Sequence, residues 1–211
     1  MKGNILTGRL PTSVLIDGEA FEIASDYRVG IQLDALSRTE DMTEIKMLEQ
    51  IVELYYTARR PANLLDAIQK ALWFYRCGAE LQDGGKQEKP SRYKRKRSKG
   101  PYYSFEQDAP YIYTAFQEQY GIDLADIEYM HWWKFSALFE SLSDKTKMGQ
   151  IMYYRRVSTS GMGSKERAYI NEMKKLYEIR DSSTAAQKIT LAERNQRWIR
   201  YVDERHKDIM K

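Results

Sequence analysis

Apolar side chains recur at three- and four-residue steps along most of the chain, which is the spacing of an amphipathic α-helix. Short polar stretches rich in glycine, serine or aspartate, such as residues 158–164, separate these segments. We predict helices from Ser25 or Asp26 to about Leu36, over 42–57, from Pro61 to Gly78, over 104–120, over 121–142, from Ser143 or Asp144 to Met152, over 165–178 and from Thr190 onward.

The pattern differs in residues 12–23, where two short runs of β-forming residues flank Asp17-Gly18. That dipeptide suits a two-residue turn with positive φ, so we predict a β-hairpin. A lone hairpin is marginally stable in water, so this one must dock either on the helices or on a partner protein. The residues do not decide between the two.

The aromatic stretch 121–142 organises the prediction for the rest of the chain. Read as a helix beginning at the N-cap residue Asp123, it is apolar around nearly its whole circumference, with adjacent Trp132 and Trp133. Such a helix is normally buried on several sides. We therefore expect it to be the central helix, with the other helices packed around it.

Together these elements predict a mainly α-helical fold, a multi-helix globular bundle of six to eight helices with a small N-terminal β-hairpin. Residues 79–101 carry glycines, prolines and basic residues without apolar periodicity, which indicates a flexible insertion. The organisation expected is one domain overall. Its segments are the hairpin region 1–24, a helical subregion 25–78, the basic insertion 79–101, a helical core with the aromatic helix 102–180, and a charged C-terminal helical tail 181–211.

Composition narrows the class of protein. The 211 residues are 42% hydrophobic and 30% charged, which fits amphipathic helices with charged outer faces. The N-terminus resembles no signal peptide, and no apolar run reaches the roughly 18 residues of a membrane span. The single cysteine, Cys77, excludes an intramolecular disulfide and is expected to be a small buried hydrophobe. We therefore expect a soluble protein of a reducing cytosol.

The net charge of +4 is concentrated in one segment. Residues 86–99 hold eight basic side chains and one acid, so the remainder of the chain carries about −3. This segment is open to three interpretations: a solvated loop, a contact for an acidic protein, or a phosphate-binding arm for nucleic acid. The candidate partner-binding residues at its centre are Arg92, Lys94, Arg95, Lys96, Arg97 and Lys99.

The aromatic stretch holds the other candidate side chains. His131 lies three residues after Glu128, but no serine or cysteine nucleophile is near in sequence, so a hydrogen-bonded core histidine is favoured over a general base. Trp132 and Trp133 are candidate partner-binding residues because tryptophan is enriched at interface hot spots, although core packing is favoured for both. With two histidines and one cysteine a zinc site is excluded. We predict no catalytic residue, cofactor or metal, and hence no enzyme.

Two distinctive motifs, Leu72-Trp-Phe-Tyr-Arg-Cys-Gly78 and His131-Trp-Trp-Lys-Phe135, occur in this order. They resemble the gene-product-fifteen family of phage tail-region proteins and are the most specific of the matching motifs. The lysine-rich insertion between the third and fourth helices is also typical of the family. Further matching motifs are Arg9-Leu-Pro-Thr-Ser-Val14, Ile16-Asp-Gly-Glu19, Tyr103-Ser-Phe-Glu-Gln-Asp108, Tyr111-Ile-Tyr113 and Glu118-Gln-Tyr-Gly-Ile-Asp123, and the resemblance covers roughly residues 6–178.

The resemblance implies a role in tail morphogenesis. Members resemble tail assembly chaperones in gene context, so the partners implied are the phage tape-measure and tail-tube proteins, in the host bacterial cytoplasm. A chaperone is expected to be absent from the mature virion. Two alternatives remain: a nucleic-acid-binding protein that uses residues 86–99, and a structural or completion subunit of the virion tail. The oligomeric state is not predicted.

Overall fold

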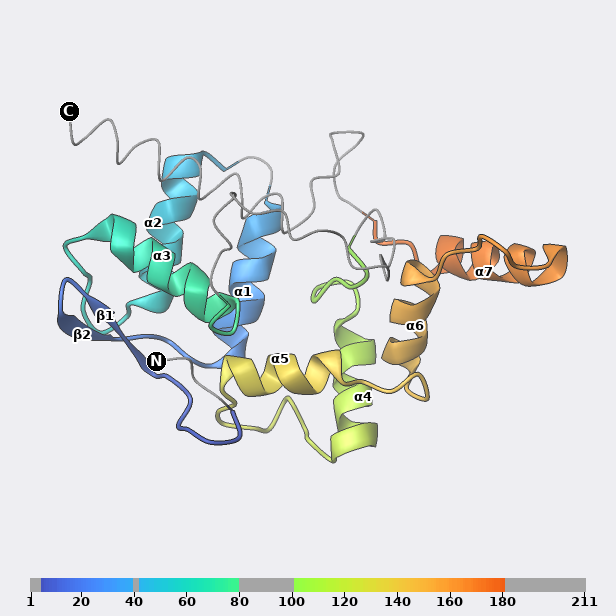
Figure 1. Cartoon of the computed structure of the whole chain (residues 1–211), viewed down its shortest axis with the longest axis horizontal. Helices are drawn as coiled ribbons and strands as arrows, with labels where there is room; N and C mark the ends of the chain where they lie inside the picture. The colour runs from blue at the N-terminus through green and yellow to red at the C-terminus, as the bar shows by residue number, and fades with distance from the viewer. Residues whose placement is uncertain (1–4, 40–41, 80–100, 181–211) are drawn as a thin grey trace, which may run out of the picture. The chain divides into compact units, whose positions relative to one another are not determined.

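The structure, a computed structural model, describes residues 5–39, 42–79 and 101–180 (Figure 1). These residues form seven helices and one two-stranded antiparallel sheet, which confirms the predicted mainly α fold with an N-terminal hairpin. The basic insertion and the C-terminal tail lie outside the described residues. Within those residues, no helix has both the length and the apolar character that a membrane crossing requires.

The chain forms two compact units. The described part of the first unit is residues 5–39, 42–79 and 127–140, and that of the second is 101–126 and 141–180. Residues 127–140 of the aromatic stretch therefore belong to the first unit, together with N-terminal residues far away in sequence, whereas the segment that directly precedes them belongs to the second.

The hairpin of the first unit pairs β1 (Ser13–Ile16) with β2 (Glu19–Glu22). Asp17 and Gly18 both have positive φ, as a tight turn between twisted strands requires. One face of the hairpin is buried, so it docks on its own core, which answers the question that the sequence left open. The buried side chains of the hairpin and of the residue after it are Val14, Ile16, Phe21 and Ile23.

Three helices of the first unit begin at side-chain caps that accept a hydrogen bond from a first-turn N–H group. Asp26 accepts from the backbone N–H of Arg28, and Thr43 and Asn63 cap the next two helices in the same way. These helices are α1 (Tyr27–Arg38), α2 (Glu44–Tyr55) and α3 (Leu64–Tyr75).

The fourth helix of this unit, α5 (Trp132–Glu140), contributes the largest core side chains. Both indole N–H groups donate to main-chain oxygens at the end of α3, Trp132 to Tyr75 and Trp133 to Phe74, each at 2.7 Å. The Trp132 ring also stacks on the Tyr75 ring at a centroid distance of 5.2 Å. Both tryptophans are buried, and their polar atoms are satisfied without solvent.

Helix α1 approaches α5 closely at one glycine. A Cβ atom at Gly30 would lie 2.2 Å from Cε3 of Trp132, so only glycine leaves room for the indole ring. Glycine in a helix costs about 1 kcal/mol relative to alanine. The close packing of Trp132 accounts for its presence here.

The predicted helix over 121–142 is wrong in its first half, because residues 121–131 are not helical. Asp123 caps no helix, and it accepts hydrogen bonds from the Ala125 N–H and the Tyr113 hydroxyl. The main chain near Met130 instead pairs with residues 25–27 through three bonds of 2.8–3.2 Å. These tertiary bonds occupy the backbone groups that a longer helix would need, so the chain stays extended up to α5.

The described part of the second unit contains three helices, with α7 packed on α6 (Figure 1). Gly121 ends the first of them in the left-handed conformation. Thr146, rather than the predicted Ser143 or Asp144, caps the second by accepting from the Gly149 N–H at 3.1 Å. These helices are α4 (Ala109–Tyr120), α6 (Lys147–Arg156) and α7 (Ser164–Leu176).

Candidate functional site

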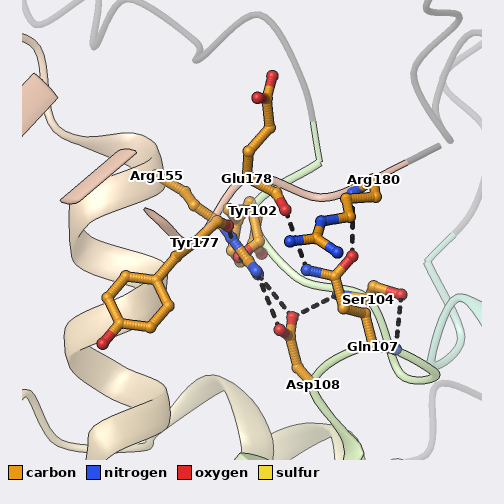
Figure 2. Close-up of polar contacts among 8 residues, drawn as sticks. All are labelled: Tyr102, Ser104, Gln107, Asp108, Arg155, Tyr177, Glu178 and Arg180. Atoms are coloured by element: carbon orange, nitrogen blue, oxygen red, sulfur yellow. Dashed lines mark hydrogen bonds and ion pairs between the residues drawn. The ribbon is translucent and has the colours of Figure 1, made fainter. Parts of the chain in front are cut away.

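A buried ion pair connects the helices of the second unit. The Asp108 carboxylate, just before α4, accepts both terminal nitrogens of Arg155 on α6, with Nη2 to Oδ1 at 2.9 Å (Figure 2). Asp108 also accepts from the Ser104 N–H at 2.8 Å. Both charged side chains are over nine-tenths buried, so the pair is held by a bidentate, charge-assisted geometry in which each charge neutralises the other.

The same arginine fastens the chain that follows α7. Arg155 Nε donates to the Tyr177 carbonyl at 2.6 Å, and Gln107 binds the backbone at Glu178 and Arg180 (Figure 2). The C-terminal end of α7 is thereby anchored to the start of α4 and to α6. A helix attached at its end in this way holds its position without burying most of its own surface.

A cluster of tyrosines joins α6 to α7. The Tyr154 ring stacks on Tyr177 at a centroid distance of 6.3 Å, and its hydroxyl lies 3.2 Å from that of Tyr169. Hydrogen bonding to Tyr169 raises the pKa of the Tyr154 hydroxyl above its ordinary value. Lys147 Nζ lies 5.0 Å from the centre of the Tyr177 ring, in a cation–π arrangement. The cluster therefore combines aromatic and basic groups at one surface.

Helix α7 buries very little of itself. Of its 13 residues only Ile170 is buried, whereas Tyr169 and Leu176 are 50% and 63% exposed. On α6, Tyr153 is 46% exposed and contacts Tyr154 edge to face. We define the α6–α7 surface as Tyr153, Tyr154, Tyr169, Met173 and Leu176. It is the candidate functional site of the chain, because three of its five side chains are exposed, and exposed aromatic and aliphatic groups mark sites of protein contact.

Comparison with known proteins assigns the family. The model of a family described as Bacteriophage Gp15 protein matches residues 6–179, which is most of the chain. The chain belongs to the bacteriophage Gp15 protein family. No curated protein and no solved structure matches it. The family match includes both units and the whole α6–α7 surface, and it confirms the family resemblance drawn from the sequence.

The six basic residues named as candidates for partner binding in this Gp15-family chain lie outside the described residues, so all three interpretations of their segment stay open. These residues are Arg92, Lys94, Arg95, Lys96, Arg97 and Lys99. The other two candidates, Trp132 and Trp133, are 5% and 4% exposed. Their indoles pack in the first unit and present no surface to a partner, in keeping with the core interpretation favoured from the sequence.

His131 is a core residue of the Gp15-family chain. Its Nδ1 accepts from the Trp133 N–H at 3.1 Å, and its Nε2 lies 3.0 Å from the Pro11 carbonyl oxygen. An acceptor at Nδ1 and a donor at Nε2 define a neutral ring. Burial lowers the pKa of the imidazole below its ordinary value. Both nitrogens are occupied by main-chain groups, so the ring acts as a cap for α5.

Cys77 is exposed, so its predicted burial is wrong. It follows α3 in a left-handed conformation, with φ of 55°, within the turn that ends the helix. Among the described residues, no three histidine, cysteine, aspartate or glutamate side chains come together as a metal site.

Sequence reasoning did not identify the α6–α7 surface or the ion pair between Asp108 and Arg155. The sequence does contain one signal, because residues 141–180 carry nine basic and four acidic side chains. The charge of about −3 for all residues outside 86–99 conceals this local basic excess. The pairing of side chains 47 positions apart has no such signal, because it depends on how α4 packs against α6.

Proposed function

We propose that this Gp15-family chain is a non-enzymatic factor in phage tail morphogenesis, an assembly chaperone that binds the tape-measure protein, the tail-tube protein or both. The observation that carries the proposal is the family match over residues 6–179. It is combined with the tail-region gene context that the family resemblance implies. The place of action proposed is the cytoplasm of the bacterial host.

The α6–α7 surface supplies physical support for this proposal. A long helical client exposes apolar stripes before it is assembled, and such stripes aggregate unless another surface covers them. A helix with a half-exposed apolar face, anchored at its end by Arg155, offers a matching helix-to-helix contact. Methionine and tyrosine side chains adapt to varied partners because they combine apolar surface with adjustable shape or a polar tip.

Co-expression tests the proposal directly. Tagged protein is produced together with the tape-measure protein of the same phage or prophage, and the soluble fraction and the tagged eluate are analysed by mass spectrometry. We expect higher client solubility and co-purification that survives nuclease treatment. Unchanged client solubility together with no retained tape-measure or tube protein would refute the chaperone function.

Two further measurements distinguish the alternatives. Recovery only of nuclease-sensitive nucleic acid would favour a nucleic-acid-binding protein that uses residues 86–99. Detection of the chain in purified particles at the copy number of a tail component would favour a structural or completion subunit. A chaperone is expected to be absent from those particles.

A further inference from the structure

We propose that the α6–α7 surface docks an amphipathic helix of a protein partner whose apolar stripe is flanked by aspartate and glutamate. The inference rests on the proposed function, because it specifies the chemistry of the client segment and the residues that receive it. Its basis is the apolar stripe on α7, the basic charge of the segment that carries the stripe, and the poor match of this surface to nucleic acid or to a second copy of the chain.

Three apolar side chains of α7, the exposed Tyr169 and Leu176 and the partly exposed Met173, form a continuous stripe. At about 100° per residue, Tyr169, Met173 and Leu176 fall within an arc of about 60° on the helix. Their i, i+4, i+7 spacing is that of a helix-binding seam. Ile170 lies to one side of this arc and is buried. The chain's own fold thus buries only the Ile170 side of the apolar face of α7. The stripe beside it remains accessible to a second helix.

The stripe continues from α7 onto α6 through aromatic contacts. Tyr154 meets the Tyr169 ring edge to face at 6.1 Å, and Tyr153 meets Tyr154 at 5.8 Å. Because the hydroxyls of Tyr154 and Tyr169 are hydrogen-bonded, the two rings are held in place before any partner arrives. Rings that are already ordered lose little conformational freedom on binding, which favours affinity.

The surroundings of the stripe are basic. From Lys147 to Leu176 there are seven lysines and arginines and two glutamates, and Arg155 is neutralised by Asp108. The segment that carries the apolar side chains therefore has an excess charge of about +4. A partner helix with acidic flanks is attracted to this surface, whereas one with basic flanks is repelled.

Charge disfavours docking of this protein's own helices on the α6–α7 surface, whether from a second copy or from the same chain. A second copy that docked α7 against α7 would bring two basic helices together. The chain's own residues 190–211 contain six lysines and arginines and four acids, so they also carry the wrong sign. Residues 101–126 hold five acids and no lysine or arginine, but within the described part of the second unit the exposed large apolar side chains all lie on α6 and α7. That acidic segment therefore lacks a matching apolar stripe.

Nucleic acid is also a poorer match. Met173 and Leu176 donate no hydrogen bond to phosphate, so the apolar stripe offers a phosphate backbone nothing to bind. The same apolar side chains are productive against a helix of a protein.

Binding of designed peptides to the full-length protein tests the proposal by fluorescence anisotropy. One labelled helical peptide carries a leucine stripe flanked by glutamates, and a second carries the same stripe flanked by lysines. We expect the glutamate-flanked peptide to bind at least tenfold more tightly. The double variant Y169A/L176A should weaken its binding at least tenfold, while L64A, which truncates an exposed leucine of α3, should change it less than twofold.

A second variant tests the proposal even if Y169A/L176A fails to fold, because it reverses surface charges and leaves the apolar side chains in place. The variant K165E/K175E should lose affinity for the glutamate-flanked peptide and gain affinity for the lysine-flanked one. Equal binding of both peptides to the wild-type protein would overturn the proposal. The proposal would also be overturned if a duplex DNA probe bound more tightly than the glutamate-flanked peptide and Y169A/L176A abolished that binding. A salt-sensitive self-association of the chain that the same variant abolishes would overturn it as well.

Failure of this inference can be separated from failure of the proposed function. If the wild-type protein retains the tape-measure protein on co-expression and Y169A/L176A retains it equally well, the docking surface is refuted while the chaperone function stands. If the wild-type protein retains neither tape-measure nor tube protein, the proposed function falls whatever the peptides show.

Discussion

Replacing Gly30 by alanine tests how the core of the first unit is packed. The substitution adds one methyl group to the buried face of α1, where it would point at the Trp132 ring. The added Cβ atom would lie 2.2, 2.4 and 2.6 Å from three carbons of the indole. Carbon atoms in a protein interior pack at about 3.5–4.0 Å, so the ring must move by about 1 Å or more.

Contributions of opposite sign decide how much G30A changes the free energy of unfolding. Helix propensity alone favours alanine over glycine by about 1 kcal/mol. Overpacking a filled core costs about 1–3 kcal/mol. A displaced indole also weakens its 2.7 Å bond to the Tyr75 carbonyl, and loss of a buried hydrogen bond costs about 1–3 kcal/mol. Together these contributions lead us to expect that G30A lowers the free energy of unfolding by about 1–5 kcal/mol.

Urea unfolding followed by circular dichroism and tryptophan fluorescence measures this change, with linear extrapolation to water. The matched control is Gln32→Ala, at an exposed position of the same helix, which should change stability by no more than about 0.5 kcal/mol. In a background of W132F the smaller ring leaves space for the methyl group. There G30A should be neutral or stabilising by up to about 1 kcal/mol.

The reasoning is refuted if G30A leaves the wild-type protein as stable as before, or makes it more stable. Equal destabilisation by G30A in the wild-type and W132F backgrounds would also contradict it, because the cost would then not come from contact with the indole.

Three other substitutions give further predictions. G149A should lower the thermal unfolding temperature more than G30A does, because its Cβ atom would lie 2.0 Å from the main-chain oxygen of Ser143, which cannot rotate away. D108N leaves Arg155 buried without its counter-charge and should cost about 3–5 kcal/mol in urea unfolding, whereas D108L/R155M should cost less than the sum of its single substitutions. For His131 the folded pKa is lowered, so the unfolded chain binds more protons and stability falls as pH drops below about 6.5. The stability gap between wild type and H131N should therefore shrink from pH 7.5 to pH 5, and a gap independent of pH would contradict this account.

Much of the fold follows from interactions between residues close in sequence, and these were predictable. Apolar spacing located every described helix, Asp17-Gly18 located the hairpin turn, and Gly121 located the end of α4. Caps and turns depend on side chains within about four residues, so the local sequence contains the information they require. One error at these sites is small, because Thr146 caps α6 in place of the predicted Ser143 or Asp144. Another is large: the predicted N-cap Asp123 caps no helix, and α5 begins only at Trp132.

Of the candidate site, the sequence determined the helical period of α7 and the basic excess around it, but not the exposure of its stripe. Apolar residues at helical spacing predict an amphipathic face without specifying what covers it. Only the packing of α7 on α6, held by Arg155 and the tyrosine cluster, leaves Tyr169 and Leu176 in solvent.

Tertiary structure also decided the conformation and surroundings of the aromatic stretch. Residues 123–131 match a helical pattern, yet backbone bonds to residues 25–27 hold the chain near Met130 extended. The environment of Trp132 likewise depends on Gly30, about a hundred positions away in sequence. Contacts of this kind arise from how whole elements fit together, so a pattern read along the chain determines which segments are helices but not which surfaces they bury.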